Sequence, residues 1–333
     1  MGNKMATREA YGKALAKLGV ENPNVVVFDA DLSKSTKTSE FKNVCPERHF
    51  NMGIAEANMM AVAAGFSTCG KIPFASTFAI FAAGRAFEQI RNTICYPKLN
   101  VKVCATHAGI TVGEDGASHQ SVEDISLMRS IPNMTVINPS DAVETEAVIR
   151  AIAEYNGPCY VRLGRAAVET INDNADYKFE IGKGITLREG KEATIIATGI
   201  MVEAALEAYN MLAEEGIKVK VINIHTIKPI DTELITKAAQ ETGVIVTAEE
   251  HSVIGGLGST VCEVVSETHP VPVMKVGIKD VFGESGKPNE LLKAYGLTAE
   301  DIVKAVKKEY HLNNNKYVYT EKEHFAPSFL FKN

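Results

Sequence analysis

Residues 101–120 read VKVCATHAGITVGEDGASHQ, an apolar run followed by a loop rich in glycine, histidine and carboxylates. The run 101–105 predicts a buried strand. Loops at strand ends usually carry the chemistry of α/β proteins, because a rigid scaffold holds them. Glycine lets the backbone approach a ligand closely, His107 and His119 can donate to anionic groups, and Asp115 can accept from a hydroxyl. The alternative interpretation is a polar turn whose histidines bond to nearby backbone.

Strand-like apolar runs alternate with helix-like segments on both sides of this loop. In the first half the expected strands are 25–28, 72–75, 101–105, 134–137 and 159–163, and the expected helices lie near 7–18, 55–67, 78–94, 121–130 and 140–154. In the second half the expected strands are 193–197, 219–223 and 244–248, and the expected helices are 202–214, 260–267 and about 299–310. The sequence Pro139-Ser140-Asp141 is typical of a helix start. The alternation predicts βαβ units. We therefore expect an α/β fold of two consecutive domains, each a mostly parallel sheet flanked by helices.

A polar stretch between the halves predicts a linker. The chain of 333 residues is long enough for about two domains, and residues 169–188 lose the periodicity of the segments around them. We expect a first domain over residues 1–168 and a second over 189–310. Residues 311–333 are polar and aromatic, and we expect a C-terminal tail that packs on a neighbour or frays.

Composition narrows the class of protein. Apolar residues make up 45% and charged residues 23% of the chain, as in ordinary globular proteins. The net charge of −6, without a strongly basic stretch, argues against a nucleic-acid partner. The six cysteines form no Cys-x-x-Cys pair, which favours reduced thiols over disulfides or a zinc site. We find no apolar signal core and no run long enough to span a bilayer, and we expect a cytoplasmic protein without a membrane partner.

A second candidate site is a carboxyl that opens an apolar helix. Residues 53–65 read GIAEANMMAVAAG, in which Glu56 is the only charged side chain. In a poorly solvated place such a carboxyl can exchange a proton near neutral pH. The alternative interpretation is a glutamate in a first turn that interacts with the helix dipole.

A pair of aromatic residues follows further along the chain. Phe78 and Phe81 lie three positions apart and would share one helix face. Core packing and a ring-binding pocket are both compatible with this spacing.

A third candidate is a scattered set of basic and hydroxyl side chains. Arg8, Ser35 and Arg165 are each of a type common on protein surfaces. Arg165 follows an apolar strand, so we expect it at the carboxyl edge of the sheet, where ligands bind. Together with His107, these side chains can clamp a phosphate.

Taken together, the motifs resemble the C-terminal half of transketolase over roughly residues 6–310. That half consists of a pyrimidine-binding domain followed by the transketolase C-terminal domain. The resemblance rests on Ala30-Asp31-Leu32, Gly-Ile-x-Glu at 53–56, Pro73-Phe74-Ala75-Ser76-Thr77-Phe78, Gly-Glu-Asp-Gly-x-x-His-Gln at 113–120 and Arg129-Ser130-Ile131-Pro132-Asn133-Met134.

The resemblance implies thiamine diphosphate as cofactor. Glu56 would contact N1′ of its aminopyrimidine and favour the imino tautomer, which takes the proton from C2 of the thiazolium. Phe81 would stack on the ring, with Phe78 beside it. The implied reaction transfers a two-carbon ketol unit from a ketose phosphate to an aldose phosphate, as in pentose phosphate metabolism.

The resemblance also implies roles toward the substrate. Asp115 would bind the hydroxyl next to the reacting carbonyl, and His119 the carbonyl or nascent alkoxide, so both join Glu56 as catalytic residues. Arg8, Ser35, His107 and Arg165 would surround the sugar phosphate. This set favours sugar phosphates over 2-oxo acids.

One family motif is missing from the chain. The family binds the diphosphate and a divalent cation through a Gly-Asp-Gly, with an Asn about thirty residues later, on a separate N-terminal domain; this sequence has no Gly-Asp-Gly. The chain therefore resembles the C-terminal subunit of a split transketolase and would itself hold no metal. We expect an N-terminal subunit that holds Mg²⁺ or another divalent cation, self-association through both domains, an α2β2 heterotetramer, and activity that requires the partner.

Two other functions remain open from the sequence. The first is a subunit of deoxyxylulose-phosphate synthase or of a 2-oxo acid dehydrogenase, which shares both domains and Glu56. The second is a non-catalytic regulatory subunit, because fold and motif do not prove activity. In the second half, Gly255-Gly256-Leu257-Gly258 favours a tight strand–helix connection over a nucleotide site.

Overall fold

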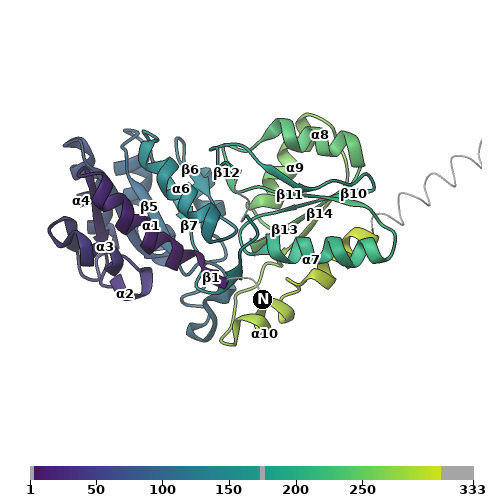
Figure 1. Cartoon of the computed structure of the whole chain (residues 1–333), viewed down its shortest axis with the longest axis horizontal. Coiled ribbons are helices and arrows are strands. Elements are labelled where there is room, and N and C mark those ends of the chain that lie inside the picture. The colour runs from purple at the N-terminus through teal and green to yellow at the C-terminus, as the bar shows by residue number, and fades with distance from the viewer. Residues whose placement is uncertain (1–3, 173–176, 309–333) are drawn as a thin grey trace, which may run out of the picture.

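The computed structural model describes residues 4–172 and 177–308 and confirms an α/β fold of two consecutive halves. Figure 1 shows the halves side by side along the long axis of the molecule, each with a sheet and its helices. The tail expected over residues 311–333 lies outside the described residues. Among the helices that are described, none combines the length and the apolar composition needed to cross a lipid bilayer.

The first half is built on a seven-stranded sheet with the strand order β12-β6-β7-β5-β4-β2-β3. Its strands are β2 (Val25–Asp29), β3 (His49–Asn51), β4 (Ile72–Phe78), β5 (Lys102–Thr106), β6 (Thr135–Ile137), β7 (Cys159–Arg162) and β12 (Thr226–Lys228). All neighbouring strands are parallel except β12, which runs antiparallel to β6. Because β12 comes from the second half of the sequence, the second half completes one edge of the first sheet.

The helices that accompany these strands are α1 (Thr7–Glu21), α2 (Ser33–Thr36), α3 (Ser39–Val44), η1 (Pro46–Arg48), α4 (Glu56–Thr68), α5 (Asp124–Ser130) and α6 (Ala142–Glu154). Helices α1, α4, α5 and α6 form near the residues where the sequence predicts them, whereas the short helices between β2 and β3 were not predicted. The start of α6 is fixed as expected, since the Asp141 carboxylate accepts a 2.8 Å hydrogen bond from the backbone N–H of Glu144.

The segment expected as one helix over residues 78–94 is built differently. β4 extends to Phe78 because its backbone pairs with Thr106 of β5. Two π-helical segments follow, η2 (Phe81–Arg85) and η3 (Gln89–Cys95). Phe78 and Phe81 therefore do not share a helix face, yet their rings still stack, with centroids 5.7 Å apart and planes 16° apart.

The second half contains a five-stranded sheet with the order β14-β13-β10-β11-β9. Its strands are β9 (Ile185–Arg188), β10 (Ala193–Ala197), β11 (Val219–Asn223), β13 (Ile245–Ser252) and β14 (Val273–Ile278), and only β9 runs antiparallel to its neighbour. Its helices are α7 (Met201–Glu214), α8 (Thr232–Thr242), α9 (Leu257–Glu267), α10 (Pro288–Ala294) and a helical segment over residues 299–308. β9 lies within the stretch 169–188, so part of that stretch belongs to the second sheet.

The two halves share a continuous core. Central strands such as β2, β5, β10 and β11 are buried along their whole length, as expected for parallel sheets covered on both faces. One cluster of buried apolar side chains joins Ile125 and Val136 of the first half to Ile222 and Val261 of the second. A short antiparallel pair, β1 (Lys4–Ala6) with β8 (Ala167–Glu169), joins the beginning and the end of the first half. Side chains of the second half can therefore hold loops of the first.

Candidate functional site

The carboxyl ends of four parallel strands bring the candidate residues to one edge of the first sheet. β2 leads to α2, β4 to the aromatic pair, β5 to the loop 107–120 and β7 to Arg165. Helices α1 and α4 begin with Arg8 and Glu56 in their first turns. Direct side-chain contacts, described below, then link these residues to one another.

His107 is the centre of this group. His107 is 3% exposed, and its ring stacks on Phe78, with ring centroids 3.9 Å apart. Nδ1 lies 2.8 Å from the Thr106 hydroxyl, and Nε2 lies 3.4 Å from Nη1 of Arg8. Burial, followed by the charges of Arg8 and Arg165, lowers the pKa of His107 to about 3. His107 is therefore neutral near pH 7, and the positive charge at the site comes from the arginines.

Arg8 connects His107 to the loop after β2. Its Nη1 donates a 2.8 Å hydrogen bond to the backbone carbonyl of Ser35. Its Nε is buried and has no acceptor among the described residues. A guanidinium with an unused buried donor suits an anionic ligand. Arg8 contacts the Ser35 backbone and not its hydroxyl.

Arg165 lies on the other side of the loop 107–120. Its Nη1 donates to the carbonyl of Val112 and lies 3.5 Å from Oδ2 of Asp115 and 3.6 Å from Oε2 of Glu114. Arg165 is about one-third exposed, so these pairs are screened by water and bind weakly. An anionic ligand that binds the Arg165 guanidinium more tightly can therefore displace these two carboxylates.

His119 stands at the end of the same loop, beside the aromatic pair. Its ring meets Phe81 edge-on, with centroids 5.5 Å apart and planes 70° apart. Nδ1 is 3.0 Å from the hydroxyl of Ser118. Because that hydroxyl engages Nδ1, the other ring nitrogen is the one available to a ligand.

Glu56 and Phe81 meet through a residue that the sequence patterns missed. Glu56 is about 5% exposed at the start of α4, and its Oε1 accepts a 3.1 Å hydrogen bond from Nη1 of Arg85. The Arg85 guanidinium also lies over the Phe81 ring, 4.0 Å from its centroid. The spacing of four residues between Phe81 and Arg85 could have indicated their contact from the sequence. The contact of Arg85 with Glu56, 29 positions away, could not have been found in this way.

Two more residues act from outside the predicted set. Gln120 closes the loop, because its Nε2 donates to the carbonyls of Ile110 at 3.1 Å and Glu284 at 2.9 Å. Glu250 on β13 accepts a 2.7 Å hydrogen bond from the backbone N–H of Thr111. Nothing in the local sequence indicates either contact, since Glu250 and Glu284 belong to the second half.

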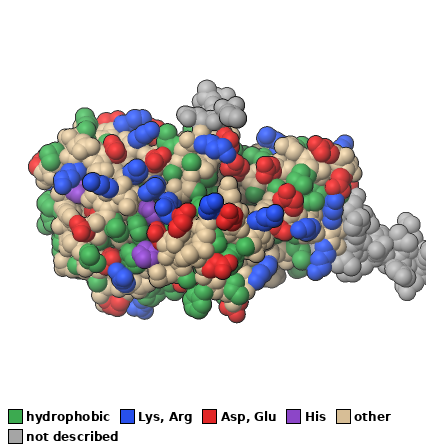
Figure 2. All heavy atoms as spheres, turned by 90° about the horizontal axis from the view of Figure 1, so that it is seen from below, with side chains coloured by type: hydrophobic (Ala, Val, Ile, Leu, Met, Phe, Trp, Pro, Cys, Tyr) green, Lys and Arg blue, Asp and Glu red, His purple; other side chains and the backbone are tan. Residues whose placement is uncertain are grey.

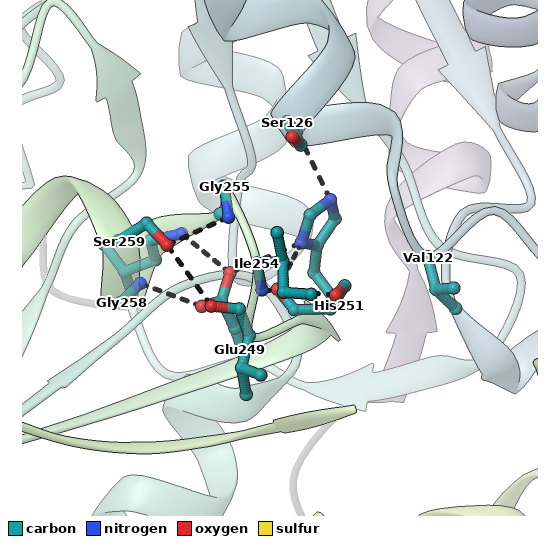
Figure 3. Close-up of polar contacts among 12 residues, drawn as sticks. Val122, Ser126, Glu249, His251, Ile254, Gly255, Gly258 and Ser259 are labelled. Atoms are coloured by element: carbon teal, nitrogen blue, oxygen red, sulfur yellow. Dashed lines mark hydrogen bonds and ion pairs between the residues drawn. The ribbon is translucent and has the colours of Figure 1, made fainter. Parts of the chain in front are cut away.

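The glycine-rich turn of the second half is capped by its own chain. Glu249 accepts hydrogen bonds from the backbone N–H groups of Leu257 at 2.7 Å and Gly258 at 2.8 Å, at the start of α9 (Figure 3). Burial raises the pKa of Glu249 to about 7. His251 accepts a 3.3 Å hydrogen bond from the N–H of Ser126. The Glu249 carboxyl therefore occupies the N-terminus of α9, where a nucleotide phosphate would otherwise bind.

The surface around the site carries mixed charges. On the face in Figure 2, histidine side chains reach the surface of one half, with basic and acidic side chains close to them. Among residues 4–172 and 177–308, no group of three or more His, Cys, Asp or Glu side chains is arranged to hold a metal ion.

Both halves match known families. Residues 3–170 match the family described as "Transketolase, pyrimidine binding domain", and residues 182–302 match "Transketolase, C-terminal domain". A protein of Methanocaldococcus jannaschii described as a transketolase C-terminal section is 54% identical, over 91% of this chain and 95% of that protein. The 6-deoxy-6-sulfo-D-fructose transketolase subunit SqwH of Clostridium sp. is 43% identical, over 90% of this chain and 92% of that protein.

A solved structure is also similar along nearly the whole chain. It is a split-gene transketolase in the form of an inactive β4 tetramer, with 62% sequence identity and a TM-score of 0.87. The match covers 92% of this chain and 99% of that one.

Proposed function

The chain belongs to the transketolase family, and we propose that it is the catalytic C-terminal subunit of a split transketolase that transfers a two-carbon ketol unit between sugar phosphates. The observation that carries the proposal is the row of contacts from Arg8 through His107 and Phe78 to Phe81, and from Phe81 through Arg85 to Glu56. These residues come from four separate stretches of the chain. They combine an anion site, an aromatic surface and a buried carboxyl at one sheet edge.

The residues present fit the aminopyrimidine of thiamine diphosphate. The Arg85 guanidinium is flat and nitrogen-bearing, rests on the Phe81 ring and donates to Glu56, which are the contacts that an aminopyrimidine would make. Phe81 and Glu56 would therefore hold this ring, with Phe78 beside it. When bound, the cofactor supplies the nucleophilic carbon and the electron sink for carbon–carbon cleavage.

The chain's own residues divide the remaining work. Glu56 holds a proton at N1′ of the aminopyrimidine, in a place that excludes most water. His119 donates a hydrogen bond to the substrate carbonyl oxygen as negative charge develops there. Asp115 accepts from the neighbouring substrate hydroxyl.

The arginines bind the far end of the substrate. Arg8, through its unused Nε–H, and Arg165, through its weakly paired guanidinium, attract a terminal anion. Ser35 and His107 line the same place, and His107 contributes hydrogen bonding without charge. A phosphate and a sulfonate share this chemistry, so both kinds of ketose belong in a substrate test.

The proposed enzyme needs a second polypeptide. An N-terminal transketolase subunit would hold the diphosphate and Mg²⁺ or another divalent cation, in an α2β2 assembly. Two comparisons support this division: a relative is a C-terminal section, and the similar split-gene structure is a β4 tetramer that is inactive.

The test is reconstitution. The purified chain alone is expected to give no measurable transfer from xylulose 5-phosphate to ribose 5-phosphate. Addition of the N-terminal subunit, thiamine diphosphate and Mg²⁺ should restore turnover in a coupled assay. Full turnover by the chain alone, or release of carbon dioxide from pyruvate in place of ketol transfer, would contradict the proposal.

Arg85 provides a prediction about cofactor affinity. Arg85 and an aminopyrimidine compete for Phe81 and Glu56. Arg85→Ala is therefore expected to tighten thiamine diphosphate binding by about two- to tenfold. This factor corresponds to the free energy of the exposed cation–π contact and ion pair that the cofactor no longer has to displace. Calorimetric titration of the assembled enzyme measures this. Arg91→Ala on η3, an exposed arginine nearby, is the control and should change nothing. Weaker binding by Arg85→Ala would mean that Arg85 holds the cofactor.

A further inference from the structure

The loop 109–116 presses its glycines against the second half of the chain. A Cβ on Gly109, whose φ is +79°, would lie 2.2 Å from Cδ of Glu250. A Cβ on Gly116 would lie 2.5 Å from Oγ of Ser285. Both distances are too short for real atoms. A side chain on Gly109 would press on the buried Glu250 carboxyl and push the loop away, whereas the exposed Ser285 hydroxyl can rotate away from a side chain on Gly116. These glycines allow close approach of the second half, whereas the sequence suggested close approach of a ligand.

Glu250 provides the polar part of this contact. Its side chain is buried, and Oε1 accepts a 2.7 Å hydrogen bond from the N–H of Thr111. Its backbone carbonyl accepts a 2.9 Å hydrogen bond from Nη2 of Arg162, which is itself paired with Asp124 at 2.9 Å. The hydrogen bond from Arg162 therefore fixes the backbone of Glu250, and the side chain places a carboxylate oxygen at a defined position beside the loop.

The loop held in this way carries or contacts most of the substrate residues. His107 stands two positions before Gly109, and Asp115 belongs to the loop itself. Arg165 donates to the carbonyl of Val112, in the middle of the loop. A displacement of the loop would thus move several substrate contacts together.

We propose that Glu250, in the second half, is a positioning residue that sets the placement of the substrate loop 107–120. This inference rests on the proposed function, since it assigns the loop to substrate binding. It gives the second half a part in the reaction in addition to assembly. Glu250 touches neither substrate nor cofactor and acts through the Thr111 backbone.

The first arm of the test measures the loop directly. Glu250→Ala removes the acceptor, so amide hydrogen exchange at Thr111 and its neighbours is expected to rise about tenfold or more. Glu250→Gln keeps an acceptor and should change exchange much less. Glu249→Gln is the matched control: it alters a buried carboxyl one position away that caps α9, and should leave Thr111 unchanged. If Glu250→Ala does not fold, Glu250→Asp, which withdraws the oxygens by one methylene, is expected to raise exchange in its place.

The second arm measures the assembled enzyme. In Glu250→Ala, kcat/KM for the sugar phosphates is expected to fall about 10²-fold, because small misplacements of reacting groups have effects of this size. The affinity for thiamine diphosphate should stay constant, since Glu56 and Phe81 lie on other elements, and Glu250→Gln should recover most of the activity.

Three outcomes separate the two proposals. Unchanged amide exchange at Thr111 in Glu250→Ala would overturn the positioning role. So would a kcat/KM of Glu250→Ala that falls no further than that of the control Glu249→Gln. A wild-type assembly without ketol transfer would overturn the proposed function, while the exchange measurements would still decide whether Glu250 holds the loop.

Discussion

Glu56→Gln is expected to lower the turnover of the assembled enzyme by about 10²- to 10⁴-fold, the usual range for loss of a proton-transferring group. Glutamine has nearly the same shape and can still hydrogen-bond to an aminopyrimidine nitrogen, but it cannot hold the proton there. The buried position of Glu56 keeps water from replacing it. Steady-state turnover with saturating cofactor measures the effect.

Two controls make this result specific. Glu88→Gln changes an exposed glutamate between η2 and η3 and should leave turnover intact. Sedimentation of the Glu56→Gln assembly should match that of the wild type, because α4 keeps its buried face. Unchanged turnover in Glu56→Gln would favour a non-catalytic, regulatory subunit.

His119→Ala is expected to reduce kcat by about 10²- to 10³-fold, as for other single donors to a developing oxyanion. The ring is held by Phe81 at its edge and by Ser118 at Nδ1, so its other nitrogen has a fixed direction. Such a donor is worth more as charge develops than in the ground state. The effect should therefore appear mainly in kcat and only weakly in KM.

Kinetics with varied donor and acceptor sugars test this prediction. His269→Gln, an exposed histidine in the second half, is the control and should behave as wild type. A raised KM with normal kcat would assign His119 to substrate binding alone.

The sequence predicted the elements well where the signal was local. The apolar run 101–105 forms β5, and Asp141 caps α6 as its position indicates. The prediction of a single helix over residues 78–94 was wrong. Pairing of Phe78 with β5 extends the strand, and no local pattern contains that partner.

In the candidate site, too, the sequence identified residues from local patterns but not their distant partners. The nine residues selected from the sequence lie along one sheet edge, because each stands at or after a strand end or opens a helix. For Phe78, which ends β4, the sequence predicted a helix instead. Their partners were not visible. Arg85 meets Glu56 across 29 positions, and Glu250 meets Thr111 across 139.

By itself, the sequence determined the alternation of strands and helices, the family, and the residue types at the sheet edge, since periodicity and motifs depend on near neighbours. The tertiary structure alone decided that β12 joins the first sheet, that Arg85 covers Phe81, and that Glu250 holds the loop. These contacts depend on how two packed halves meet, because side chains distant in the chain become neighbours only when the shared core forms.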